Sequence, residues 1–132
     1  MKKLLKTCFP EDLFYPVFDY KAFVKPVAFA GIIKTHFDFF STFIKCYLLC
    51  YVCVHPDYRL QGRGIDIVEK VIKKIPKNEP RIIVANCAPN NVEFYEKCGF
   101  SKTELRAIYT DRNDEDFVMI RMVGDIYLGD EP

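Results

Sequence analysis

The chain has 132 residues, a formal net charge of +1, and a composition that is 50% hydrophobic and 28% charged. This length fits a single domain, residues 1–132, that buries roughly two thirds of the surface of its unfolded chain. The near-neutral charge excludes nucleic-acid binding through bulk charge, and no run reaches the ~18 apolar residues of a membrane span. The basic start has neither a long apolar run nor a small-residue cleavage site, so we expect a cytoplasmic protein with no membrane partner.

The start of the chain predicts one short helix, and three strands follow it. The helix is expected after Pro10, with Glu11 and Asp12 in its first turn and Pro16 at its end. Three stretches rich in β-branched and aromatic residues predict strands, with a turn at Lys25-Pro26 between the first two: residues 18–24, 27–37 and 42–54. The first of these stretches is also compatible with an extension of the helix.

Six cysteines raise the question of disulfides or zinc. Cys46, Cys50 and Cys53 fall in the third predicted strand, where alternation would place Cys46 and Cys50 on one face and Cys53 on the other. Such a strand cannot gather three thiolates around one ion. We therefore expect no metal site and free thiols that pack as small hydrophobic side chains.

The second half of the chain alternates between helical and strand patterns. Residues 62–75 predict a helix that ends at Pro76, with one apolar face formed by Ile65, Val68, Val71, Ile72 and Ile75. Residues 81–86 predict a short buried strand, and residues 100–109 and 116–123 predict two final strands joined by an acidic loop.

A second helix is expected between those strands. Asn90 fits its N-cap, because Glu93 follows three residues later in the capping-box pattern. Gly99 stands where a helix closes in a left-handed conformation.

The loop before the first of these helices carries a phosphate-binding pattern. It reads V-H-P-D-Y-R-L-Q-G-R-G-I and places Arg59, Gly62 and Gly64 between a strand and a helix. A helix start has unpaired backbone N–H groups and the positive end of the helix dipole, so it binds a phosphate well. The glycines let the backbone approach the anion closely.

A second motif, N-N-V-E-F-Y-E-K-C-G-F at residues 90–100, follows in the chain. Together the two motifs resemble the GNAT superfamily of N-acetyltransferases, over a motif core of about residues 27–123. The resemblance implies an α/β fold with a mixed central β-sheet splayed around an acetyl-CoA site. The region before the strands is shorter than the two helices usual in that family. The resemblance also implies an enzyme that moves an acetyl group from acetyl-CoA to a primary amine, without a metal.

The resemblance also assigns site residues. Tyr95 would be the general acid that meets the sulfur of the cofactor, and Asn91 would hydrogen-bond the pantetheine arm, which would lie along the backbone of Val52, Cys53 and Val54. The pyrophosphate would be held by the loop, in which Arg59 opens the turn and backbone N–H groups come from Gln61, Gly62, Arg63, Gly64 and Ile65.

The second motif is similar to the corresponding helix of the glucosamine-6-phosphate N-acetyltransferases, which implies an amino sugar phosphate acceptor and a dimer. The chain has Cys50 and Asn86 where those enzymes carry a Glu and an Asp. Asn86 can orient an amine but cannot remove its proton, so the base would be a water chain or an acidic residue of the C-terminal segment. An amino sugar ionises near neutrality, whereas a lysine amine near 10.4 needs a stronger base.

Three functions stay open at this point. The first is N-acetylation of glucosamine 6-phosphate. The second is acetylation of a protein lysine, a polyamine or another small amine, which the seven acidic residues that follow Thr110 would attract. The third is a non-catalytic module that binds acyl-CoA.

Overall fold

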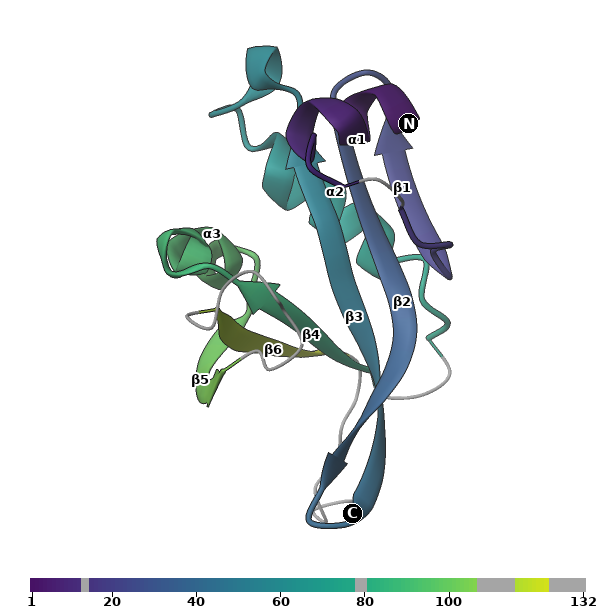
Figure 1. Ribbon diagram of the computed structural model, residues 1–132, viewed down its shortest axis with the longest axis vertical. Helices are drawn as coiled ribbons and strands as arrows, with labels where there is room; N and C mark the ends of the chain where they lie inside the picture. The colour runs from purple at the N-terminus through teal and green to yellow at the C-terminus, as the bar shows by residue number, and fades with distance from the viewer. Residues whose placement is uncertain (13–14, 78–80, 107–115, 124–132) are drawn as a thin grey trace. The chain divides into compact units, whose positions relative to one another are not determined.

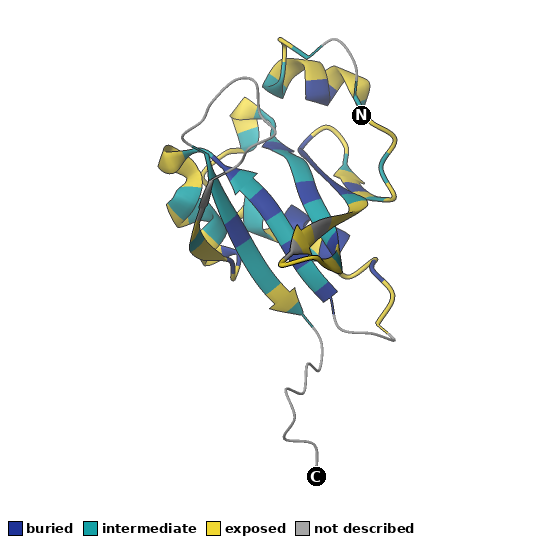
Figure 2. Cartoon of the chain, turned by 60° about the horizontal axis from the view of Figure 1, so that its bottom comes forward, coloured by how far each residue is buried: buried dark blue, intermediate teal, exposed yellow. Residues whose placement is uncertain are grey.

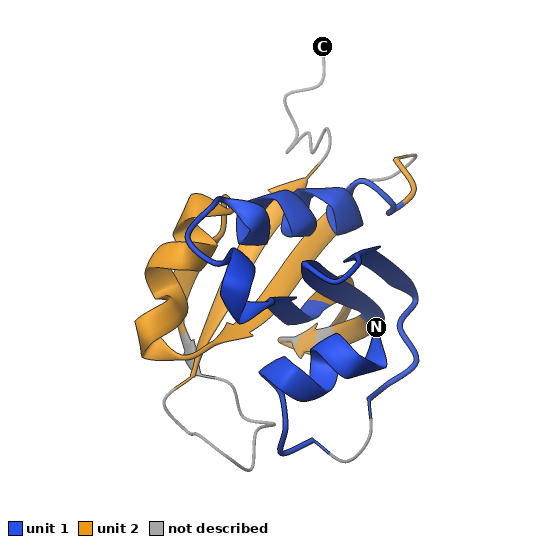
Figure 3. Ribbon diagram, turned by 90° about the horizontal axis from the view of Figure 1, so that it is seen from above, with its two compact units in different colours: residues 1–34, 49–75 blue, residues 35–48, 76–132 orange. Residues whose placement is uncertain are grey.

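A computed structural model of the chain describes residues 1–12, 15–77, 81–106 and 116–123. The chain divides into two compact units, Met1–Lys34 with Leu49–Ile75 (unit 1) and Thr35–Leu48 with Pro76–Pro132 (unit 2) (Figure 3). Two long strands, β2 (Ala28–Phe39) and β3 (Thr42–Val54), run from one unit into the other. Among the described helices, none has the length and apolar character needed to cross a bilayer.

Unit 1 combines three strands with two α-helices (Figure 1). The strands follow the order β1-β2-β3, and β1 (Tyr20–Val24) pairs antiparallel with β2 in a register that joins Tyr20 to Ile32. The helices are α1 (Lys2–Cys8) and α2 (Arg63–Ile72), and a short 3-10 helix, η1 (Pro56–Tyr58), lies between β3 and α2.

The predicted N-terminal helix is wrong in position: α1 precedes Pro10 instead of following it. Its two buried residues, Leu4 and Leu5, pack in a cluster with Phe29 and Cys53. That contact stabilises a helix too short to form alone. The expected helix after Pro10 depended on Glu11 and Asp12 as first-turn residues, and these two lie in a turn and in irregular structure.

The predicted helix at the phosphate loop is confirmed as α2, with one change in its buried face. Ile67 is buried, whereas Ile65 is only half-buried. The remaining members of the predicted face, which lie close to one another on successive turns, are buried as expected: Val68, Val71, Ile72 and Ile75. Lysine and glutamate side chains occupy the opposite side, as the helical period requires.

Unit 2 contains the outer part of the β2–β3 hairpin and a second group of strands. Phe40 and Ser41 form its two-residue turn, and both have positive φ angles, 49° and 64°, as tight hairpin turns require. The strands follow the order β4-β6-β5, with β4 (Arg81–Cys87) and β5 (Ser101–Arg106) both antiparallel to β6 (Phe117–Val123). Alternate residues of β4 are buried, as Figure 2 shows. The predicted acidic loop lies outside the described residues.

The helix α3 (Val92–Lys97) lies between β4 and β5, and the predicted cap at its start is wrong. Asn90 belongs to a 3-10 turn, η2 (Pro89–Asn91), so Asn91 precedes the helix and its side chain makes no capping hydrogen bond. Pro89 favours this extra turn, because its fixed φ suits the first residue of a helical turn. The left-handed closure at Gly99, with φ of 87°, is confirmed.

The six cysteines are free thiols, and four of them are buried: Cys46, Cys53, Cys87 and Cys98. In β3 the buried positions are Cys46, Leu49 and Cys53, so they do not keep a two-residue period. The odd spacing falls between Cys46 and Leu49, and the strand also contains one left-handed residue, Tyr51, with φ of 53°.

Candidate functional site

The loop before α2 has a backbone shaped for an anion. Gly62 has φ of 74° and ψ of 7°, and Arg63, which follows it, begins the helix. A left-handed residue followed by a right-handed one turns successive N–H groups toward one side, which forms an anion-binding concavity. The first helical hydrogen bond runs from the Asp66 N–H to the Gly62 carbonyl at 3.1 Å. The N–H groups ahead of it, which helix geometry leaves without partners in the helix, belong to Arg63, Gly64 and Ile65.

The loop also stores strain. Leu60 has φ of 65° and is fully exposed, with a relative accessibility of 104%. A left-handed conformation costs an ordinary residue about 1–2 kcal/mol, and an exposed leucine gains no packing energy in return. Such strained positions gather at functional sites. Gln61, which lies between Leu60 and Gly62, is also exposed to solvent.

The end of β3 carries the residues expected along the cofactor arm. Val52 and Val54 are half-buried and Cys53 is buried, and all three follow the irregular residue Tyr51. The guanidinium Nε of Arg59 donates to the Val54 carbonyl at 3.0 Å. Arg59 therefore ties the loop back to the last residue of the strand.

His55 starts the turn between that strand and the loop. Its Nδ1 accepts a hydrogen bond from the Asp57 N–H at 3.1 Å, and its own N–H donates to the Val27 carbonyl at 2.7 Å. An Nδ1 that accepts from a backbone amide carries no proton, so the 3.7 Å approach of the Asp57 carboxylate is not an ion pair in this tautomer. His55 is therefore a structural residue of the turn.

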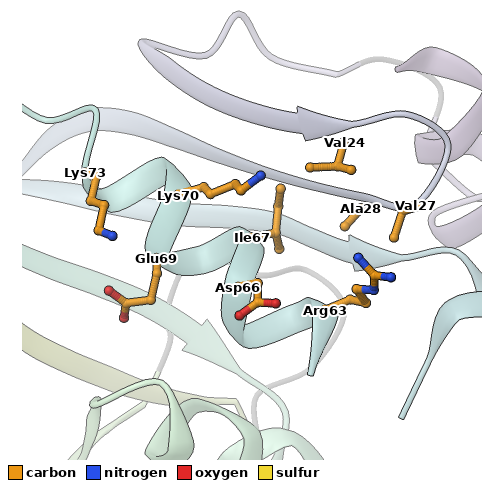
Figure 4. A pocket seen from close by; sticks show the side chains of 9 residues that line it. All are labelled: Val24, Val27, Ala28, Arg63, Asp66, Ile67, Glu69, Lys70 and Lys73. Atoms are coloured by element: carbon orange, nitrogen blue, oxygen red, sulfur yellow. The ribbon is translucent and has the colours of Figure 1, made fainter. Parts of the chain in front are cut away.

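A cavity of about 260 Å³ lies between α2 and the β1–β2 turn. Arg63 extends toward Val27 and Lys70 extends toward Val24, whereas the carboxylate of Asp66 points away (Figure 4). Lys73 and Glu69 also line it. Three basic side chains, Arg63, Lys70 and Lys73, thus share one cavity within unit 1.

Contacts at the C-terminal end of α3 hold Tyr95 in place. Phe100 N–H donates to the Tyr95 carbonyl at 3.0 Å, and Gly99 N–H donates to the Glu96 carbonyl at 3.0 Å, which is the Schellman arrangement. The buried ring of Phe100 packs edge-on against the Tyr95 ring at 5.7 Å. Arg121 adds a further constraint, because its Nη1 donates to the carbonyl of Cys98, the C-cap residue of α3, at 2.8 Å.

Asn86 lies on β4 in the same unit, opposite Val118 of β6, and is half-buried. Asn91 is exposed at the start of α3. Unit 2 therefore holds Asn86, Asn91 and Tyr95, and unit 1 holds the expected cofactor residues of β3 and the loop.

One acidic residue near Asn86 was not singled out by the sequence. Asp116 precedes β6, and the next residue, Phe117, pairs with Cys87 of β4. Burial first, and then the charge of Asp116, raise the pKa of the Cys87 thiol to about 11. The Asp116 Oδ1 is shielded from solvent and accepts no hydrogen bond from the described residues. A shielded carboxylate oxygen without a donor is costly, which marks Asp116 as a candidate functional group.

Comparison with known proteins places these features in a family. An acetyltransferase (GNAT) domain model matches residues 15–102. Glucosamine 6-phosphate N-acetyltransferase of Schizosaccharomyces pombe is 35% identical over 54 residues, which are 41% of this chain and 49% of that protein. The chain thus spans about half the length of this curated relative.

Two solved structures resemble the fold. ElaA of Escherichia coli is 18% identical with a TM-score of 0.52, and the match covers 72% of this chain and 60% of ElaA. An N-acetyltransferase structure from Lactobacillus plantarum is 16% identical with a TM-score of 0.51, and the match covers 92% of this chain and 87% of that one. The family model covers more than half of the sequence and both structures share its α/β fold, so the chain belongs to the GNAT acetyltransferase family.

Proposed function

We propose that this protein transfers an acetyl group from acetyl-CoA to the amine of glucosamine 6-phosphate. The observation that carries the proposal is the left-handed Gly62 directly before the free N–H groups of α2. The backbone N–H groups at this helix start are the donors that a cofactor pyrophosphate would need. The space beside Gly62, where a Cβ would lie, is open. Membership in the GNAT family, whose members use acetyl-CoA, supports the same cofactor.

Each part of the loop and strand has a role in this proposal. Backbone N–H groups of Gln61 and Gly62, with those of Arg63, Gly64 and Ile65, hold the pyrophosphate, and Arg59 keeps the loop closed on β3. The backbone of residues 52–54 aligns the pantetheine arm. Acetyl-CoA, when bound, supplies a thioester that an amine attacks.

Residues of unit 2 carry out the proton transfers in this proposal. The Tyr95 hydroxyl gives a proton to the departing sulfur, and Asn91 helps to hold the arm. Asn86 orients the amine through its amide oxygen, and Asp116 takes the proton that the amine loses. The shielded, unpartnered Oδ1 of Asp116 supports that last assignment, because it has an accepting lone pair to offer.

Two considerations favour an amino sugar phosphate as the acceptor. The curated relative that matches 54 residues is named a glucosamine 6-phosphate N-acetyltransferase. An amino sugar also ionises near neutrality, so a weak base is sufficient to supply its neutral form, whereas a lysine amine near 10.4 is almost fully protonated at pH 7.

Thiol release from acetyl-CoA in the presence of glucosamine 6-phosphate tests the proposal. We expect turnover by the wild-type protein and a loss of about a hundredfold or more in kcat for Tyr95→Phe, since a general acid contributes roughly 10²–10⁴-fold. Equal kcat values for the two proteins would remove Tyr95 from the mechanism. Turnover with a lysine peptide or spermine but not with the sugar phosphate would replace the proposed acceptor by the second candidate class.

A further inference from the structure

A second cavity of unit 1, of about 520 Å³, opens between α1, the segment 15–18 and β1. Its volume is in the range of small-molecule sites. Three lysines line it, Lys2 and Lys6 from α1 and Lys21 from β1. We call this cavity the lysine pocket.

The charges of the lysine pocket are unbalanced. Lys2 and Lys6 are four residues apart and therefore lie on the same side of α1, where like charges repel. Lys21 is exposed and precedes the buried Ala22 in β1. Because side chains alternate along a strand, Lys21 projects from the face opposite to that of Ala22. Within the described residues, no carboxylate forms an ion pair with any of the three lysines. An anion bound among them would relieve this repulsion.

The floor of the lysine pocket is aromatic and held in place. The Tyr15 hydroxyl donates to the Phe9 carbonyl at 3.1 Å, which fixes the ring. Phe18 packs against the fully buried Phe29 at 5.2 Å, and it lies so close to Gly31 that a Cβ there would overlap its ring. Such a rigid apolar surface suits the ring face of a small organic ligand.

The same two rings connect the lysine pocket to the candidate site. Tyr15 and Phe18 contact the Tyr51 ring edge-on at 5.5 Å and 5.8 Å. Tyr51 directly precedes Val52, the first of the residues proposed to align the cofactor arm. The lysine pocket is therefore separated from that strand by one layer of aromatic rings.

We propose that the lysine pocket binds the phosphate monoester of a small phosphorylated amine, the acceptor of the acetyl group. Lys6 and Lys21 pair with the phosphate from opposite sides, Lys2 adds to the local potential, and Tyr15 and Phe18 contact the body of the molecule. The assignment rests on the proposed function only for the fate of the amine, since phosphate binding is measurable without turnover.

Isothermal titration calorimetry of the full chain tests phosphate binding directly. Glucosamine 6-phosphate, glucosamine and inorganic phosphate are titrated into the wild type, a Lys6→Ala/Lys21→Ala variant and a Lys3→Ala control. Lys3 is an exposed lysine of α1 that does not line the cavity. Circular dichroism of each variant confirms that α1 and β1 are intact.

We expect glucosamine 6-phosphate to bind and glucosamine to bind at least tenfold more weakly. The double variant should lose about tenfold or more in affinity for the sugar phosphate, because it removes two charge-assisted contacts with the phosphate. The Lys3→Ala control should stay within about twofold of the wild type, since Lys3 does not line the cavity and its exposed charge is screened by solvent. Equal losses in the double variant and the control, or equal binding of the two sugars, would overturn the proposal.

Acetyl transfer separates this inference from the proposed function. Lysine-dependent binding of the sugar phosphate without any acetyl transfer would preserve the lysine pocket and refute the proposed function. Acetyl transfer to the sugar phosphate with the same KM in the wild type and in the double variant would preserve the function and refute the pocket. A carboxylate-bearing amine that binds more tightly than the phosphate would also refute the phosphate assignment.

Discussion

Replacing Gly62 tests how the candidate phosphate loop is built. Its φ of 74° lies in the left-handed region, and no atom lies within 4 Å of the position that a Cβ would take. Any cost of a side chain at this position therefore arises from the backbone and not from a clash. For an alanine that cost is about 1–2 kcal/mol, for an asparagine it is smaller, and for a β-branched valine it is larger.

Urea denaturation measures these differences. With an m-value of about 1–3 kcal/mol/M, a loss of 1–2 kcal/mol moves the midpoint by roughly 0.5–1 M. We expect the midpoints to fall in the order Gly62, Gly62→Asn, Gly62→Ala and Gly62→Val. Acetyl-CoA affinity should fall in the same order, because a loop that relaxes to negative φ turns its N–H groups away from the pyrophosphate.

The asparagine variant is the matched control, since it adds a side chain but tolerates the left-handed region. If Gly62→Ala keeps the wild-type midpoint, or if Gly62→Asn loses as much as Gly62→Val, the loop does not depend on a left-handed residue. The anion site would then not depend on the backbone geometry of Gly62.

Three further predictions concern unit 2 and the thiols. Asp116→Asn should lower kcat/KM by about a hundredfold, while the free energy of unfolding stays equal or rises because a shielded carboxylate is removed; an unchanged kcat/KM would count against its role as the base. Arg121→Met should cost about 1 kcal/mol in urea unfolding, because it removes the donor at 2.8 Å from the last turn of α3, and an unchanged midpoint would show that this contact is dispensable. Burial raises the pKa of Cys50 to about 12 and contributes first to raising that of Cys87 to about 11. The folded state therefore keeps these protons longer than the unfolded state, and stability should be lost as pH rises from about 9 toward 11–12; thermal unfolding midpoints that stay constant up to pH 11 would contradict this.

The strands of unit 1 were predictable because their composition is decisive. The bounds predicted for the third strand, residues 42–54, coincide with β3, and the turn at Lys25-Pro26 falls between β1 and β2. Dense β-branched and aromatic residues leave few alternatives to a strand. The irregular residue Tyr51 gave no signal, because its left-handed conformation depends on tertiary packing.

The ends of helices were harder to predict from local patterns. α1 forms because Leu4 and Leu5 contact Phe29 and Cys53, which are distant in sequence, so its few apolar residues understate its stability. At α3 the N-x-x-E pattern from Asn90 to Glu93 fits a capping box, but the preceding proline starts a 3-10 turn and moves the helix start by one residue.

The candidate site also has features that the sequence indicated and features that it did not. The glycines of the loop indicated a backbone that can approach an anion closely, and in the structure Gly62 adopts a left-handed conformation that few other residues accept. Asp116 was hidden, because its shielding arises from the pairing of β6 with β4. The lysine pocket was hidden as well, since its lysines come from a helix and a strand that only the folded chain brings together.

The central claim is that this chain acetylates an amine with acetyl-CoA. Its most direct test is release of free thiol from acetyl-CoA by the pure protein, with glucosamine 6-phosphate, spermine and a lysine peptide compared in parallel and the product identified by mass spectrometry. The account predicts release with the sugar phosphate and an N-acetylated product. If acetyl-CoA binds but no free thiol is released with any one of the three amines, the protein does not acetylate them. That result would indicate a non-catalytic module that binds acyl-CoA.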